Sequence, residues 1–457
     1  MAPIKAIALN YLLLLQLAFG AVIPEAPQVS KRSAILPPTS DPFYVPPAGY
    51  ENQKPGAILQ SRTLGHLAFG GIVPLQTNAA YQLLFRSTDS LGNASAAVTT
   101  VIVPDNANTT RVLSYQTGED SSWANCAPSY TLQFGSNTLD GGTVSAEQLL
   151  MVAALDQGWI VNVPDHEGLS SAYPSGIQAG QATLDSIRAI LVSGQLTSIS
   201  PNAVYQMWGY SGGALASEWA AELQATYALE LNFIGAAFGG LIPSVPSVLK
   251  TINKGLFAGF APTGILGLAS AYPALQPLLD EHLVPSTAAY FRKPLTQCLI
   301  QDALDFALQD IFAYFDIGIH ILDDPVVQSI LNKTGYMGRH GTPQMPVFAY
   351  KALGDEVSPI ADTDALVQKL CSQGAKIEYV RDMFGEHVTE AITGAGDAFN
   401  FLIDRFNGVP IPTRCRTRTI LSDILDPRSL AILGETVVDA LMALLQVPIG
   451  PSSIGSI

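Results

Sequence analysis

Short apolar runs alternate with amphipathic helical patterns along most of this chain. The strand-like runs lie at residues 112–116, 159–163, 203–208, 233–238, 347–351 and 376–380. The helical patterns lie at residues 179–192, 213–225, 364–370 and 388–406. Two further strand-like runs, 81–87 and 96–103, flank a turn and are expected to pair. Strands that alternate with helices predict an α/β fold with a mainly parallel sheet and helices on both faces.

One long interval interrupts this alternation. Residues 241–340 are rich in glycine and apolar residues and contain a helical pattern at 299–314. Pro262, Pro273 and Pro277 break the apolar runs, so no membrane span is expected here. We interpret the interval as an inserted helical cap between two parts of the core, 33–240 and 341–415. The alternative is two extra core helices with no role at the site.

The two ends of the chain differ in pattern from the part between them. Lys5 and the apolar stretch that follows it predict a signal peptide over residues 1–20, and Lys31-Arg32 suggests the end of a pro-peptide over 21–32. We therefore expect a secreted, extracellular protein without a stable transmembrane anchor. The carboxyl-terminal segment, 416–457, is expected to be a helical tail.

The cysteines and the charge agree with secretion. An even set of cysteines suggests two disulfides, and dispersed positions fit no zinc motif, although spacing leaves three pairings open. The four are Cys126, Cys298, Cys371 and Cys415. Glycosylation sequons begin at Asn93, Asn108 and Asn332. A formal net charge of −15 argues against nucleic acid or an anionic membrane as a partner.

Residues 209–213, Gly-Tyr-Ser-Gly-Gly, match the nucleophile-elbow pattern G-x-S-x-G. The match is preceded by a strand-like run and followed by a helical pattern, which is the context the motif requires. Glycines beside the serine allow a strained turn with close backbone approach. Ser211 is therefore the predicted nucleophile.

A serine hydroxyl needs a base and an orienting acid, which follow it in the order acid, then histidine, in such a fold. His387 follows the last predicted strand, whereas His282 and His320 lie in the proposed cap and His340 precedes the strand that should carry the acid. Asp355 is the preferred acid because it follows the strand at 347–351. Its rivals are Glu356, Asp382 and Glu386.

The oxyanion of an acyl-transfer intermediate needs hydrogen-bond donors. The amide of Gly212 follows the nucleophile and is one candidate, and the loop at 115–122 should supply the second. His166, between Asp165 and Glu167, looks like part of a metal cluster but lacks a second ligand pair. A structural role is expected for it, and no metal or organic cofactor is required.

These motifs together resemble the fungal secretory lipase family, over about residues 41–415. The resemblance rests on the Gly-Tyr-Ser-Gly-Gly elbow and on shared segments at 41–44, 114–116 with 119–120, 125–130, 165–168, 255–260, 354–359 and 386–387. It implies an α/β-hydrolase fold with an inserted helical cap, and a triad of Ser211, Asp355 and His387. It also implies oxyanion donors at the amides of Asp120 and Gly212, and disulfides Cys126–Cys298 and Cys371–Cys415.

The expected function is secreted hydrolysis of carboxylic esters, most simply as a triacylglycerol lipase acting on lipid at a water interface. The first alternative is a short-chain carboxylesterase that deacetylates secondary metabolites. A serine peptidase would need a peptide subsite, for which the sequence shows no sign. A catalytically inactive binding protein on the same fold is the alternative outside enzymes, and the complete set of triad residues argues against it.

Overall fold

The computed structural model describes residues 35–137, 141–411, 413–423 and 426–429, together with residues 431 and 434. The predicted signal peptide and pro-peptide lie outside the described residues, as does most of the predicted carboxyl-terminal tail. Residues 416–420, the start of that tail, form a β-strand instead of a helix.

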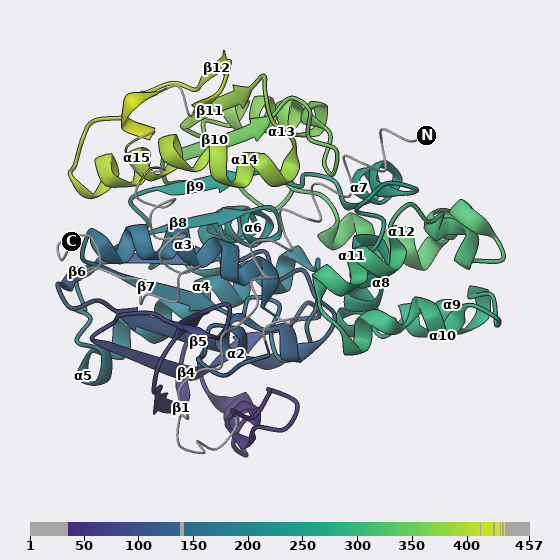
Figure 1. The fold of residues 1–457 in the computed structure, drawn as a ribbon, viewed down its shortest axis with the longest axis horizontal. Coiled ribbons are helices and arrows are strands. Elements are labelled where there is room, and N and C mark those ends of the chain that lie inside the picture. The colour runs from purple at the N-terminus through teal and green to yellow at the C-terminus, as the bar shows by residue number, and fades with distance from the viewer. Residues whose placement is uncertain are drawn as a thin grey trace, which may run out of the picture.

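A ten-stranded sheet, in the order β1-β4-β5-β7-β6-β8-β9-β10-β11-β12, is the centre of the molecule (Figure 1). The strand bounds are β1 (Ile58–Thr63), β4 (Ala79–Thr88), β5 (Ala94–Val103), β6 (Asn108–Gln116), β7 (Trp159–Pro164), β8 (Val204–Tyr210), β9 (Ala236–Gly239), β10 (Val347–Ala352), β11 (Ile377–Asp382) and β12 (Arg416–Ile420), with β2 (Ala68–Phe69) and β3 (Val73–Pro74) paired separately. Neighbours from β7 to β12 are parallel, while β1, β4 and β5 join antiparallel at one edge. The predicted mainly parallel sheet is therefore confirmed.

Helices cover both faces of this sheet. Buried residues of α4 (Gly176–Val192), α6 (Gly212–Tyr227) and α13 (Ile360–Ser372) form the core on one face. Buried residues of α3 (Gly142–Asp156) and α15 (Ala395–Phe406) form the core on the other. The central strands face apolar helices on both sides, and for this reason β7 and β10 are buried along their whole length.

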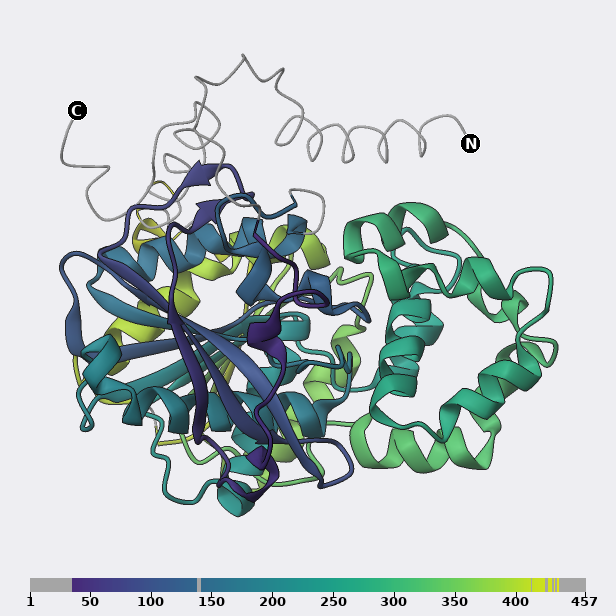
Figure 2. The same cartoon turned by 90° about the horizontal axis from the view of Figure 1, so that it is seen from below.

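The segment between β9 and β10 forms a helical lobe beside the sheet. Figures 1 and 2 show it as a teal and green group of helices to one side of the strands. Its helices are α7 (Val245–Ile252), α8 (Phe260–Ala271), α9 (Leu275–His282), α10 (Ala288–Phe291), α11 (Leu299–Phe306) and α12 (Pro325–Thr334), with short 3-10 turns at Lys293–Thr296, Ile311–Tyr314 and Gly318–Asp323. Its apolar side chains continue the α4–α6 core without a break.

Two helices differ from the sequence-based expectation. The pattern at 388–406 forms α14 (His387–Thr393) and α15, separated at Gly394, where the Tyr350 ring packs so close that a Cβ would overlap it. The pattern at 299–314 ends as a helix at Phe306, because Ala307 leaves the helical conformation with ψ 130°, and Leu308 then adopts a left-handed backbone with φ 64°. Remaining short elements are Pro42–Tyr44, Tyr50–Asn52, Ala124–Cys126, α2 (Pro128–Thr131) and α5 (Gly194–Thr197).

None of the helices in the described part of the chain is long and apolar enough to cross a membrane.

Candidate active site

Ser211 lies on a sharp turn between β8 and α6. Its backbone has φ 53° and ψ −117°, a conformation that costs energy for a residue with a Cβ and is typical of functional turns. The glycines around it permit close packing, since a Cβ on Gly213 would overlap the carbonyl of Gln116 in β6. The half-buried hydroxyl therefore stands at the carboxyl end of a central strand.

The three predicted triad residues form one chain of hydrogen bonds. The Ser211 hydroxyl lies 2.7 Å from Nε2 of His387, and Nδ1 of His387 lies 2.8 Å from Oδ2 of Asp355. Asp355 and His387 are 8 % and 4 % exposed. These atoms come from the ends of β8 and β10 and from the start of α14, so the parallel sheet brings together residues that are 176 positions apart.

Backbone contacts hold His387 in this position. The Tyr210 hydroxyl donates to the His387 carbonyl at 2.6 Å, and the His387 N–H donates to Oε2 of Glu356 at 2.7 Å. Glu356, a rival for the acid, thus contacts the histidine backbone and not its ring. The other rivals serve elsewhere: Asp382 accepts from the Asp423 N–H, and Glu386 caps α14.

Every side-chain oxygen of Asp355 is bonded. Oδ1 accepts the backbone N–H groups of Val357 and Ser358 at 2.9 and 2.7 Å, and Oδ2 accepts from His387 and from Nζ of Lys351 at 2.7 Å. Burial alone would raise the pKa of Asp355, but the charges and hydrogen bonds of His387 and Lys351 hold it well below its usual range. The carboxylate therefore stays ionised.

Sequence reasoning missed Lys351. This lysine is fully buried in β10, within a strand whose other residues are nearly all apolar. A lysine inside a buried strand needs a partner, and that is the signal that could have identified it.

The loop after β6 passes beside the elbow and has a strained backbone at Asp120, with φ 47°. The Asp120 carboxyl packs directly on Gly212, where a Cβ would overlap Oδ1. Gly212 is the first residue of α6, and the first N–H groups of a helix have no acceptor within the helix. The predicted donors, Asp120 and Gly212, are therefore neighbours in space.

Three side chains that sequence reasoning did not assign to the site hold this loop. Nε2 of His166 lies 2.8 Å from the Thr117 carbonyl, and Oε2 of Glu147 accepts the Gly118 N–H at 2.9 Å. Oε2 of Glu167 accepts the Ser121 N–H at 3.2 Å, and the Asp120 N–H faces the same carboxyl. Burial lowers the pKa of His166 to about 4, so its ring is neutral and donates to the carbonyl.

Burial also raises the pKa of the carboxyls around this loop. The pKa of Asp120 and that of Asp165 rise to about 7, and those of Glu119, Glu147 and Glu167 rise well above the usual value. No group of histidine, cysteine and carboxylate side chains within the described ranges could hold a metal ion. Through their contacts His166 and Glu167 support the loop, whereas Asp165 accepts the N–H and the hydroxyl of Ser129 in α2.

The remaining histidines take no part in the triad. Nδ1 of His282 and Nδ1 of His320 each lie 2.9 Å from a carboxylate on the lobe, that of Asp316 and that of Asp323, and the His340 ring packs on Trp219.

Two disulfides have the pairing that the resemblance implies. Cys126–Cys298 joins the loop after β6 to the lobe, and Cys371–Cys415 joins the end of α13 to the segment before β12. Asn93, Asn108 and Asn332, the predicted glycosylation sites, are all exposed.

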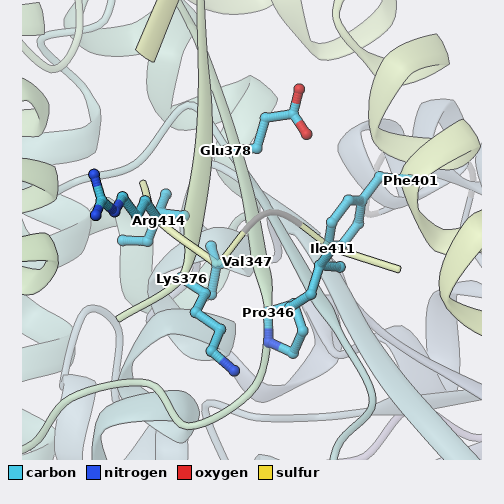
Figure 3. A pocket seen from close by; sticks show the side chains of 8 residues that line it. Pro346, Val347, Lys376, Glu378, Phe401, Ile411 and Arg414 are labelled. Atoms are coloured by element: carbon cyan, nitrogen blue, oxygen red, sulfur yellow. The ribbon is translucent and has the colours of Figure 1, made fainter. Parts of the chain in front are cut away.

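A separate recess lies at the other end of the sheet. It is lined by the first residues of β10 and β11 and by Phe401, Ile411 and Arg414 (Figure 3). Ligands of open parallel sheets bind at the carboxyl ends of the strands, where Ser211 lies, and not at the amino ends. We therefore assign no catalytic role to this recess.

Known proteins are similar to this chain in sequence and in fold. A sequence model of the secretory lipase family matches residues 132–413. The chain is 42% identical to lipase A of Arthroderma benhamiae over 92% of its length and 90% of the relative, and 39% identical to lipase 5 of Candida albicans over 91% and 90%. The crystal structure of Candida antarctica lipase A in its closed state has a TM-score of 0.80 and 28% identity, covering 92% of this chain and 99% of that one.

Proposed function

The chain belongs to the secretory lipase family, and we propose that it hydrolyses acylglycerol esters through an acyl-enzyme formed on Ser211. The observation that carries this proposal is the unbroken chain of hydrogen bonds from the Ser211 hydroxyl through His387 to Asp355. A serine hydroxyl becomes a good nucleophile only when an adjacent base takes its proton, and here His387 is that base.

The steps follow from the geometry. His387 takes the Ser211 proton as the oxygen attacks the ester carbonyl, and then donates it to the departing alcohol. Asp355 keeps the imidazole in the tautomer that presents a free Nε2 to serine. Water, activated by the same histidine, releases the acid and restores the serine. The low pKa of Asp355 leaves the proton on the imidazole during these steps.

The developing oxyanion has the Gly212 N–H as its first donor, at the start of α6, where the helix dipole favours negative charge. Asp120 supplies the second from the opposite loop. The Asp120 N–H also faces the Glu167 carboxyl in the structure. To bind the oxyanion, this N–H must therefore share its hydrogen between the oxyanion and Glu167, or rotate away from Glu167.

We propose that the helical lobe acts as a cap over the site. Its apolar interior favours a long acyl chain over a short one. One recess in it is lined only by apolar side chains, among them Leu249, Leu268, Leu279, Phe315 and Ile330. Ile242, three residues after the end of β9, lines a neighbouring recess that is also mainly apolar. Hydrocarbon buried in such surroundings gains about 0.8 kcal/mol per methylene, which favours long-chain esters.

The test is Ser211→Ala, compared with wild type on p-nitrophenyl esters from acetate to palmitate. The variant should fold and be secreted as wild type is but lose ester turnover and fluorophosphonate labelling. Wild-type turnover by the variant would show that Ser211 is not the nucleophile. In the wild-type series kcat/KM should rise with chain length; a maximum at acetate would favour a short-chain deacetylase.

Extracellular action is also part of the proposal. Two disulfides in the described structure are what an oxidising compartment allows, and the predicted leader accounts for export. Activity in the culture medium of a producing cell, absent after deletion of residues 1–20, would support it.

A further inference from the structure

Lys351 is an unusual residue for its place. Its side chain is completely buried in β10, and Nζ donates to Oδ2 of Asp355 at 2.7 Å and to the Leu241 carbonyl at 2.9 Å. A buried ammonium ion costs several kcal/mol of desolvation unless a charged partner compensates for it. Burial lowers the pKa of Lys351, and the charge of Asp355 opposes that change. The lysine is therefore held there by the triad acid.

Lys351 and His387 bond the same oxygen atom. Nζ of Lys351 and Nδ1 of His387 lie 2.7 and 2.8 Å from Oδ2 of Asp355. Two donors to one oxygen lie within about 6 Å of each other, a range over which charges change protonation equilibria. A proton added to the imidazole thus meets an attractive carboxylate and a repulsive ammonium group together.

This balance matters for a general base. A carboxylate beside a histidine favours the imidazolium ion, and an imidazolium cannot accept the serine proton. We propose that Lys351 is a positioning residue of the triad, which partly neutralises Asp355 and so keeps His387 available as a base in mildly acidic solution. This inference rests on the proposed function of Ser211.

Other charged and titratable groups also face the histidine and its acid. On α14 and the loop after β10, Glu390 and Glu356 carry carboxyls whose pKa is raised by burial, to about 9 for Glu390, so Glu390 is neutral near pH 7. The others are Tyr210 of β8, whose ring is 5.4 Å from the imidazole, Asp362 of α13 and Tyr379 of β11. Lys351 is the cation in direct contact with Asp355 among the described residues.

A second contact provides a matched control. The hydroxyl of Ser358 donates to the Leu241 carbonyl at 2.9 Å, which is the same acceptor that Lys351 uses. Ser358→Ala therefore removes a tether between the start of the lobe and the triad loop without changing any charge. Lys369→Met removes a positive charge from an exposed position on α13.

The experiment compares the pH dependence of kcat/KM on p-nitrophenyl butyrate for wild type, Lys351→Met and Lys351→Gln. Gln keeps N–H donors on a side chain that is one methylene shorter, but it carries no charge. Both variants should move the midpoint of the acid limb to higher pH by about 1 unit, measured against the plateau of each variant. Ser358→Ala and Lys369→Met should keep the wild-type midpoint.

A folded Lys351 variant with the wild-type midpoint would overturn the inference and leave the proposed function intact. The same holds if Ser358→Ala moves the midpoint as far as Lys351→Gln does, because tethering would then explain the shift. If neither Lys351 variant folds, the role of Lys351 is to stabilise the fold, and the proposed effect on the acid limb is overturned. Wild-type protein without turnover or fluorophosphonate labelling would overturn the proposed function, and this inference with it.

Discussion

At the scale of single residues, strained backbone and buried side chains lie close to the Ser211 hydroxyl. Ser211 and Asp120 both have positive φ without being glycine, and they lie on the two loops that face each other at the elbow. Such backbones persist only where surrounding contacts fix them. For Ser211 the contacts are glycines packed against β6, and for Asp120 the surrounding loop is held by the side chains of His166, Glu147 and Glu167.

The role of Glu167 gives a prediction at this scale. Burial and the neighbouring carboxyls raise the pKa of Glu167 well above its usual value, and an uncharged Gln keeps an equivalent acceptor for the Ser121 N–H. Glu167→Gln should keep most of the activity. Glu167→Leu should release the loop and lower kcat by about 10- to 100-fold, less than the loss of a whole oxyanion donor. Steady-state kinetics would measure this, and equal kcat values for the two variants would contradict it.

At the scale of elements, the parallel strands bring the three triad residues together. β8, β10 and β11 run in the same direction, so the loops at their carboxyl ends meet at one edge of the sheet. Ser211, Asp355 and His387 each follow one of these strands directly or within a few residues. Strand direction therefore explains why residues so distant along the chain lie within hydrogen-bond reach.

The edge strand β12 gives the prediction for this scale. β12 pairs only with β11 among the described strands, and Cys371–Cys415, with a sequence separation of 44, fastens the chain just before it. The double variant Cys371→Ser/Cys415→Ser should lower the free energy of unfolding by about 2 to 4 kcal/mol, because the unfolded chain regains the entropy of an open loop. Urea unfolding would show this as a lower midpoint.

The catalytic activity of the double cysteine variant provides the control for the unfolding experiment. Because the triad residues lie after β8, β10 and β11 and not on β12, kcat/KM at 25 °C should stay close to the wild-type value. An unchanged unfolding midpoint would mean that β12 is held by its strand pairing alone.

At the scale of the whole molecule, the buried carboxyls make stability depend on pH. Burial raises the pKa of Asp120, Asp165 and Asp302 to about 7 and that of Glu390 to about 9. A carboxyl with a raised folded-state pKa contributes stability that is fully present below the unfolded value, about 4, and is lost as pH rises through the folded value. Asp355 has the opposite sign, and its contribution is lost only in strong acid.

The melting temperature should therefore fall between pH 5 and pH 9. Glu390→Gln should flatten the upper part of this decline, because Gln cannot ionise. Differential scanning calorimetry across this range would measure both, and a melting temperature that rises from pH 5 to pH 9 would contradict the assignment. The formal net charge of −15 acts in the same direction, since repulsion among carboxylates grows as pH rises.

Sequence alone determined much of this protein, because local patterns carry the information. The period of apolar residues identified the strands and helices that build the sheet, and Gly-Tyr-Ser-Gly-Gly identified a turn that few other residue types allow. Chain order then selected Asp355 and His387, and the structure places both beside Ser211. Local pattern could not show that the Tyr350 ring of another element packs against Gly394, between α14 and α15.

The tertiary structure decided what depends on contacts between distant segments. Glu356 and Asp355 are adjacent in sequence, yet one bonds the backbone of His387 and the other its ring. Lys351 and Glu147 carry no motif, and Glu167 lies in a shared segment that gives no hint of its contact. All three join the site because the fold places them against its loops. The Gly-Tyr-Ser-Gly-Gly elbow specifies a nucleophile by its local backbone, whereas the charges and supports around that nucleophile depend on burial, which only the folded chain creates.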